Sequence, residues 1–189
     1  MHFWIALALL ASVQGALAQS RDAALTPDLS TVKRQAASGD PKAEAELGTM
    51  YEKGDGVPQD YPQAASWFRK AAEQGAATAQ NDLGTLYDHG QGVSQDHSQA
   101  AIWYRRAAEQ NLAEAQYNLG VLYKHGWGVP QDYEKAYFWL DLAAAKKVEG
   151  IDVDRVRDDA ASHLKPADLS RAQERARKWF EDHLKKANP

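Results

Sequence analysis

Cysteine is absent from the 189 residues of the chain. Disulfide bonds, cysteine-ligated metal sites and a lipid-anchored cysteine at a cleavage point are therefore excluded. The chain also lacks an excess of positive charge. It has 22 Lys and Arg against 26 Asp and Glu, which gives a formal net charge of −4 with both signs interspersed. Without a strong positive field, neither nucleic acid nor an anionic membrane surface is expected as the main partner.

The chain also lacks an apolar run long enough to cross a bilayer. The leading apolar stretch, 3–13, has 11 residues, which is too short for a membrane span. The small-x-small sequence at 16–18 precedes Gln19 and is typical of a signal-peptide cleavage site. We therefore expect a signal peptide over 1–18, cleaved after Ala18, and a periplasmic or secreted protein without stable membrane insertion. The leading segment has no Lys or Arg, so an uncleaved apolar helix is the alternative.

The chain does contain a unit of 36 residues that is written three times. The loop sequence Gly-Asp-Gly-Val at 54–57 recurs as Gly-Gln-Gly-Val at 90–93 and as Gly-Trp-Gly-Val at 126–129. A fixed period of this size is typical of stacked-repeat solenoids, which usually serve as binding surfaces. The other positions that keep step are Leu47, Leu83 and Leu119; Tyr51, Tyr87 and Tyr123; Asp60, Asp96 and Asp132; and Trp67, Trp103 and Trp139.

Each unit predicts a pair of helices. The first helices are expected to begin near Pro41, Ala77 and Ala113, where apolar residues take up helical spacing. They end before the glycine loop, because glycine stops a helix and turns the chain. The second helices are expected over roughly 61–73, 97–109 and 133–148.

An aspartate stands at the start of each second helix, where its side chain caps free backbone amides. Asp60 and Asp96 each have a glutamine three residues later, which matches the reciprocal capping box. Asp132 has Lys135 in that place, so its box is incomplete. The third copy also has two lysines, 146–147, where the first has a Gln-Gly stop, so we expect its second helix to be about one turn longer.

Glycine recurs inside every first helix, at Gly48, Gly84 and Gly120. Glycine in a helix interior costs about 1 kcal/mol relative to alanine. Its recurrence predicts that a neighbouring helix backbone approaches closely at these positions, where any side chain would clash. The role assigned to these glycines is packing.

A stacked array needs ends that do not expose an apolar face. Residues 27–38 resemble an N-terminal half-unit, and 152–163 and 166–186 resemble two closing helices. The prediction is an all-α fold of about nine helices: a right-handed α/α solenoid of stacked antiparallel helix pairs with capping helices. After a flexible segment over 19–26, the repeat array with its half-unit is expected over 27–148 and the C-terminal capping helices over 149–189.

The repeat resembles the Sel-one-like repeat, a relative of the tetratricopeptide repeat. The pattern A-x-x-x-LG-x-x-Y-x-x-G-x-GV-x-x-D-x-x-x-A-x-x-W-x-x-x-A-A is complete in 43–72 and matches in 79–108 and 115–144. The resemblance implies an α-solenoid. It also implies an adaptor, assembly factor or inhibitor, and bacterial members are often exported to the periplasm. Cysteine-rich members have been linked to β-lactams or peptidoglycan, but this chain lacks those cysteines.

The outward stripe of each first helix is the candidate partner site. In the third copy this stripe carries an aromatic and a β-branched residue, and Trp127 replaces Asp55 and Gln91 in the next loop. Exposed aromatic residues close together are typical of a binding hot spot. The alternative is that Trp127 folds back onto the closing helices. Acidic residues near the first two stripes either attract a basic partner segment or form a solvated face. The predicted partner-binding residues are Asn81, Thr85, Asp88, Tyr117, Val121, Lys124 and Trp127.

No catalytic residue, cofactor site or metal site is predicted. Ser-x-x-Lys occurs at 30–33 and 162–165, but the Ser-Asp-Asn and Lys-Thr-Gly sequences of serine β-lactamases are absent. His89 precedes a loop glycine at a helix C-terminus, where a cationic side chain favours the helix dipole. A metal site there would need further ligands, and Asp88 and His97 are the candidates.

These observations favour an exported, non-catalytic interaction module that binds another protein or a peptide segment as an adaptor or regulator. One alternative is a cell-envelope enzyme or ligand-binding protein that acts on peptidoglycan or β-lactams. A second is a structural component of an envelope assembly.

Overall fold

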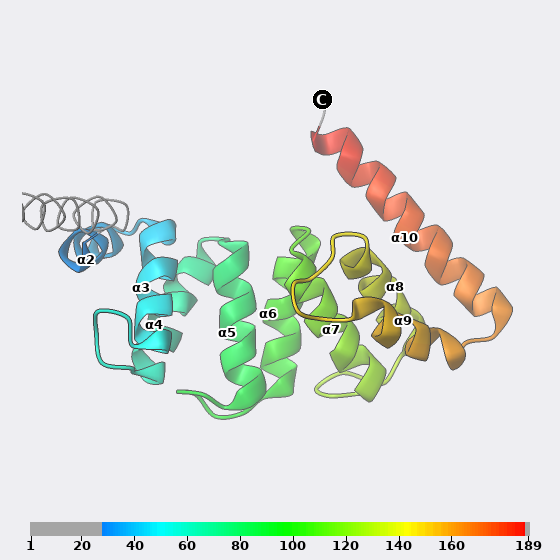
Figure 1. The fold of residues 1–189 in the computed structure, drawn as a ribbon, viewed down its shortest axis with the longest axis horizontal. Coiled ribbons are helices and arrows are strands. Elements are labelled where there is room, and N and C mark those ends of the chain that lie inside the picture. Colours follow the sequence, from blue (N-terminus) through cyan, green and yellow to red (C-terminus); the bar gives the residue numbers. More distant parts are fainter. Residues whose placement is uncertain (1–27, 188–189) are drawn as a thin grey trace, which may run out of the picture.

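A computed structural model describes residues 28–187, which contain nine helices and no strand. The helices follow one another in chain order from one end of the array to the other (Figure 1). The predicted signal peptide and the segment 19–26 lie outside the described residues. The helices are α2 (Leu29–Ala37), α3 (Pro41–Lys53), α4 (Tyr61–Glu73), α5 (Ala77–His89), α6 (His97–Glu109), α7 (Ala113–His125), α8 (Tyr133–Ala144), α9 (Val153–Ser162) and α10 (Pro166–Ala187).

The helices pack in pairs, and each pair packs on the next. Within the repeats α3 contacts α4, α5 contacts α6 and α7 contacts α8, while α4 contacts α5 and α6 contacts α7. Helix α2 packs on α3 as the half-unit, and α8 contacts both α9 and α10. The predicted fold class, an all-α solenoid of stacked helix pairs, is confirmed.

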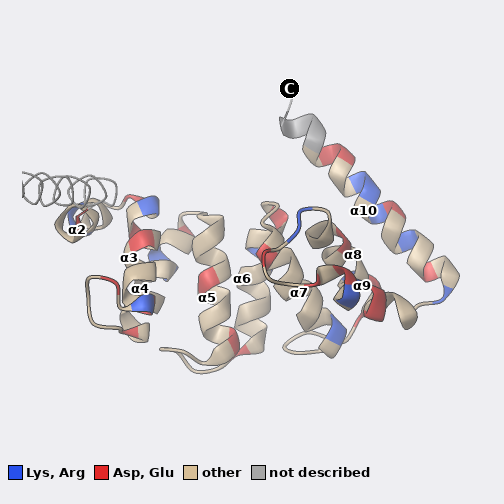
Figure 2. Cartoon of the chain, in the orientation of Figure 1, with Lys and Arg blue, Asp and Glu red and all other residues tan. Residues whose placement is uncertain are grey.

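The closing helix α10 leans away from the row at its C-terminal end (Figure 1). Lysines and arginines alternate with acidic residues along it (Figure 2). Arg177 lies 2.7 Å from Glu174 and Arg171 lies 2.6 Å from Asp168, one helical turn apart in each case. Such exposed pairs add little stability, but they keep the outer side of the last helix solvated.

The core repeats the same positions in each pair of helices. Each first helix buries a leucine and each second helix buries a large side chain, and all six are at most 1% exposed. Burying one such side chain is worth about 1.5–3 kcal/mol. The solenoid is therefore held together by burial repeated at a fixed phase. These residues are Leu47, Leu83 and Leu119 on the first helices and Phe68, Tyr104 and Leu140 on the second.

The helix glycines make the close approach that the sequence predicts, but to a side chain. A Cβ on Gly48 would lie 2.6 Å from Cδ1 of Phe68, and one on Gly120 would lie 2.7 Å from Cγ of Leu140. The expected backbone neighbour is therefore wrong for Gly48 and Gly84, and at Gly120 the backbone oxygen of Ala136, at 3.3 Å, comes only after the Leu140 side chain. Glycine is needed because it leaves room for a full-size core side chain of the second helix.

A second set of glycines joins successive repeats. A Cβ on Gly92 would lie 2.3 Å from the carbonyl carbon of Tyr61, and one on Gly128 would lie 2.2 Å from that of His97. Each loop therefore rests on the first turn of the second helix in the preceding repeat. Gly56, which has no repeat before it, meets only the Met50 methyl group at 3.4 Å.

The aspartates cap the second helices, but not through a capping box. Asp60 Oδ1 accepts a hydrogen bond from the Gln63 amide at 2.9 Å, and Asp132 Oδ1 accepts one from the Lys135 amide at 2.9 Å. The Asp60 backbone N–H, which a capping box would give to the glutamine side chain, donates to the Tyr51 carbonyl at 2.8 Å. The expected reciprocal box was therefore wrong, and Asp132 caps α8 without a glutamine.

The prediction that the second helix of the third repeat is one turn longer was also wrong, because this helix, α8, ends at Ala144. Lys147 adopts a left-handed conformation with φ of 55°, at the position where Gly75 has 93° and Asn111 has 69°. The next residue, Val148, is 7% exposed. Burying valine offsets the strain on the lysine, so the chain turns there without glycine.

Candidate functional site

The seven predicted partner-binding residues lie on α5, on α7 and in the loop after α7, and none of them is fully buried. Asn81 and Thr85 sit between the helices. The Asn118 side chain donates to Asn81 Oδ1 at 3.1 Å, and the Tyr104 hydroxyl donates to Thr85 Oγ1 at 3.2 Å. The other predicted residues separate into two pockets, except Val121, which lines neither.

Asp82 adds a titratable group beside Asn81. The Asn81 side-chain amide donates to Asp82 Oδ1 at 3.3 Å. Burial raises the pKa of Asp82 to about 6, against the lowering effect of that hydrogen bond. This part of α5 therefore holds a carboxylate that is costly to ionise.

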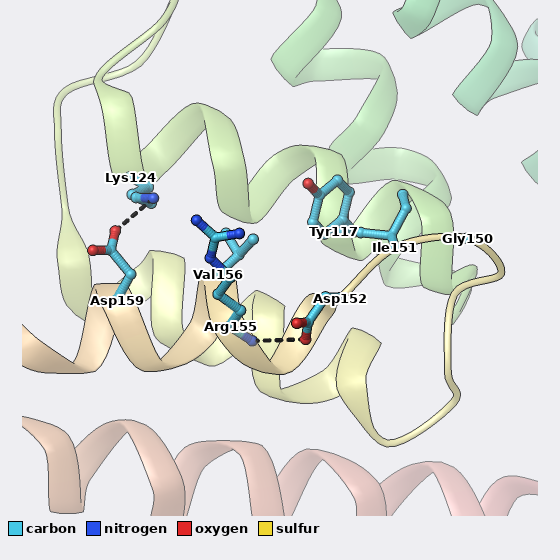
Figure 3. A pocket seen from close by; sticks show the side chains of 8 residues that line it. All are labelled: Tyr117, Lys124, Gly150, Ile151, Asp152, Arg155, Val156 and Asp159. Carbon is cyan, nitrogen blue, oxygen red and sulfur yellow. Dashed lines mark hydrogen bonds and ion pairs between the residues drawn. The ribbon is translucent and has the colours of Figure 1, made fainter.

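The first pocket has a volume of about 460 Å³ and lies between α7 and the closing segment (Figure 3). Tyr117 and Lys124 line it from α7. The pocket exists because the connection from α8 to α9, 145–152, has eight residues, whereas 74–76 and 110–112 have three each. The other lining residues are Gly150, Ile151, Asp152, Arg155, Val156 and Asp159.

This first pocket carries charges of both signs. Lys124 Nζ lies 2.6 Å from Asp159 Oδ2, and the hydrogen bond from Lys124 lowers the pKa of Asp159. Asp152 accepts from the Arg155 amide at 3.1 Å, and the Arg155 guanidinium extends toward α7, between Lys124 and Tyr117 (Figure 3). Part of the third stripe is thus covered by the closing segment.

The second pocket, of about 380 Å³, lies at the loop ends of the second and third repeats. Trp127 is 46% exposed there. Its ring stacks on His125 with centroids 4.6 Å apart and on His97 with centroids 5.8 Å apart. Trp127 therefore packs toward the preceding repeat, and the alternative that it folds onto the closing helices does not describe the structure. The lining residues are Asp88, His89, Gln95, His97 and Trp127.

The Sel1 repeat matches this chain over 41–75, 77–112, 113–148 and 160–181. The chain belongs to the Sel1 repeat family. Three of the matches coincide with the three copies found in the sequence, while the fourth falls in α9 and α10, which were predicted as capping helices. Sel1 repeats generally mediate protein–protein interaction, and the fold is generally a non-enzymatic scaffold.

Two solved structures are similar to this Sel1 repeat chain. One is c5321, a protective antigen of uropathogenic Escherichia coli strains with an SLR fold, at 44% identity and a TM-score of 0.63 over 68% of this chain. This chain spans only 27% of that protein's length. The other is a Sel1 repeat protein from Oxalobacter formigenes, at 40% identity and a TM-score of 0.63 over 71% of this chain and 99% of that one. No curated protein matches the sequence.

The structure brings together two residues that the sequence offered as metal ligands. His97 Nδ1 lies 2.6 Å from Asp88 Oδ1. His89 Nδ1 lies 3.0 Å from the Thr85 carbonyl oxygen, the contact expected at a helix C-terminus. Among the described residues no three His, Asp or Glu side chains converge as a metal site would require. The Asp88–His97 pair is therefore interpreted as a polar contact between helices.

The two Ser-x-x-Lys sequences of this Sel1 repeat protein lie at helix ends. The Ser30 hydroxyl donates to the Asp28 carboxylate, and the Ser162 hydroxyl donates to the Asp159 carbonyl at 2.7 Å. Both hydroxyls thus make local bonds of the kind that shape helix termini. In the part of the chain that is described, no helix is long and apolar enough to cross a membrane.

Sequence reasoning missed the residues that the closing segment brings to the first pocket. Ile151 is 39% exposed, and Arg155 extends toward α7 from the first turn of α9. The available signal was the loss of the repeat register after Lys147, because a longer connection leaves space beside α7. The identity of the residues that fill this space depends on where α9 begins.

Proposed function

We propose that this Sel1 repeat protein is an exported adaptor or regulator that binds a segment of another protein across its second and third repeats. The family supports the kind of function, since Sel1 repeats generally mediate protein–protein interaction. The site is supported by one observation, the 46% exposure of Trp127. Large aromatic residues that stay exposed in a folded chain are enriched among binding hot spots.

Crosslinking in the native cells, followed by purification and mass spectrometry, tests this proposal. The mature protein is compared with a Tyr117→Ala, Trp127→Ala double variant, and circular dichroism checks that both fold. An Ile102→Ala variant is the matched control, because Ile102 is 41% exposed on α6, outside both pockets. We expect a partner that the wild type and the control capture and the double variant loses.

Two results would contradict the proposal. A partner retained by the double variant would refute this site, but the protein would still be an interaction module. No partner with any of the three proteins would refute the adaptor function. The exported location has its own test, since the mass of the mature protein should correspond to a chain that begins at Gln19.

A further inference from the structure

The tryptophan rings on α4 and α6 each carry a cation from the same helix. Lys70 Nζ lies 3.8 Å from the ring centroid of Trp67, and the Arg106 guanidinium carbon lies 4.5 Å from that of Trp103. No lysine or arginine of the described residues lies over the ring of Trp127, although this ring is 46% exposed. Tryptophan is the side chain that attracts cations most strongly. Trp127 is stacked on the imidazoles of His97 and His125, but the part of its ring that stays exposed carries no lysine or arginine of the described residues.

A carboxylate lies in the same pocket as this ring. Asp88 Oδ1 is bonded to His97 Nδ1 at 2.6 Å, and the second carboxylate oxygen has no hydrogen-bond donor among the described residues. The lining residues include no lysine or arginine. Lys124, next to His125 in the sequence, is bonded to Asp159 at 2.6 Å. An aromatic face and a carboxylate together complement a single ammonium or guanidinium group.

The position of Trp127 is fixed before any ligand binds. Its backbone N–H donates to the Leu122 carbonyl at 3.1 Å, and the next residue, Gly128, accepts from the Ser98 hydroxyl at 3.1 Å. The ring itself is stacked on two imidazoles. A pre-positioned ring loses little conformational entropy on binding, which makes a small site effective.

The corresponding place one repeat earlier lacks this arrangement. Gln91 stands where the third repeat has Trp127, and Tyr61 stands where the second has His97. Glu52 supplies an acidic residue at the position of Asp88, but glutamine stands in place of the tryptophan. Gln91 also shows that the loop accepts glutamine at this position.

We infer that Trp127 and Asp88 form a receptor for one cationic side chain, a lysine or an arginine, presented by the partner protein. The cation lies against the exposed ring of Trp127 and bonds to the free oxygen of Asp88. This inference rests on the proposed function and specifies the chemistry that the partner must carry at this pocket.

The test uses a peptide of known composition on the purified mature protein. The ¹⁵N-labelled protein is titrated at pH 8 with acetyl-Gly-Ser-Lys-Ser-Gly-amide and with the same peptide carrying norleucine in place of lysine. The shift of the Trp127 indole N–H, assigned from its loss in Trp127→Gln, reports binding. We expect the lysine peptide to saturate with a Kd on the order of 1–10 mM, at least about fivefold tighter than the norleucine peptide.

Two variants locate the response. Asp88→Asn should weaken lysine binding by about fivefold or more, because it removes the charge but keeps an oxygen for His97. Trp127→Gln, followed through amide shifts of Gln95 and His97, should abolish saturation. Ile102→Ala should leave the affinity unchanged, since Ile102 lies outside the pocket.

Three results would overturn the inference. Equal affinity for the norleucine peptide would make the pocket apolar, and tighter binding of a glutamate peptide would reverse the charge. No indole shift up to about 50 mM lysine peptide would exclude a site of the expected strength. If no indole shift is seen but crosslinking captures a partner that only the double variant loses, the cation site is refuted and the adaptor function stands. If the lysine peptide binds but crosslinking captures no partner, the cation site stands and the adaptor function is refuted.

Discussion

Replacing Gly128 by alanine tests whether backbone contact between repeats holds the array together. The added Cβ would lie 2.2 Å from the His97 carbonyl carbon and 2.4 Å from its oxygen. These atoms belong to the first turn of α6, which cannot shift without moving the helix. With φ at +65°, the new residue also has a left-handed backbone, which costs about 1–2 kcal/mol for a residue with a Cβ. Overpacking against rigid neighbours adds about 1–3 kcal/mol, so the expected loss of unfolding free energy is about 2–5 kcal/mol.

Gly56→Ala is the matched control for this substitution. Gly56 has φ of +68°, but its nearest neighbour is the flexible Met50 side chain at 3.4 Å. Only the backbone cost of about 1–2 kcal/mol is expected here. Urea unfolding followed by far-ultraviolet circular dichroism measures both losses. If Gly56→Ala lowers the unfolding free energy as much as Gly128→Ala does, the junction contact contributes nothing and the reasoning is refuted.

Three further perturbations test other parts of the structure. Burial raises the pKa of Asp82 from 3.8 to about 6, so its contribution to stability is present below pH 4 and is lost as the pH rises to 6. Between pH 4 and pH 7.5, the unfolding free energy of Asp82→Asn should therefore rise by on the order of 1–2 kcal/mol relative to that of the wild type, as measured by urea titration. The same difference between variant and wild type at both pH values would contradict this. Asp132→Ala removes the cap on α8, and we expect the unfolding free energy to fall by about 1 kcal/mol, as for the aspartates of the other repeats. A much smaller loss would show that the aspartate caps the helix well only with a glutamine three residues later. The Arg105 guanidinium donates to the Tyr123 hydroxyl at 2.6 Å across the repeat junction. Tyr123→Phe should cost about 1 kcal/mol, or about 2–4 °C in melting temperature, and an unshifted melting curve would show that water replaces the bond.

The sequence predicts most helix bounds of the repeats to the residue, because glycine loops and capping aspartates punctuate every copy. The structure has α4 at Tyr61–Glu73 and α6 at His97–Glu109, as expected. The error at α8 comes from treating glycine as necessary for a left-handed turn. Lys147 takes that conformation because the next residue, Val148, is buried, and a packing gain of that kind is invisible to a local pattern.

The candidate site could be predicted only in part, for a related reason. Helical spacing predicts an outward stripe, but Asn81, Thr85 and Tyr117 are only partly exposed, and the first two bond to Asn118 and Tyr104 on neighbouring helices. It cannot place Trp127, whose neighbour His97 is 30 residues away and belongs to another repeat. Nor can it place Arg155, whose approach to α7 depends on the length of the preceding connection.

The geometry of the repeat junction therefore determines the geometry of the second pocket. Trp127 meets His97 because the following residue, Gly128, has no side chain and allows the loop to rest on the first turn of α6. Asp88 lines the same pocket and is itself held by His97 at 2.6 Å. A partner that occupies this pocket can bind only when the second and third repeats are both folded and in register. Binding energy at the pocket is consequently also stabilisation of the junction, since a ligand of the folded form alone shifts the folding equilibrium toward it.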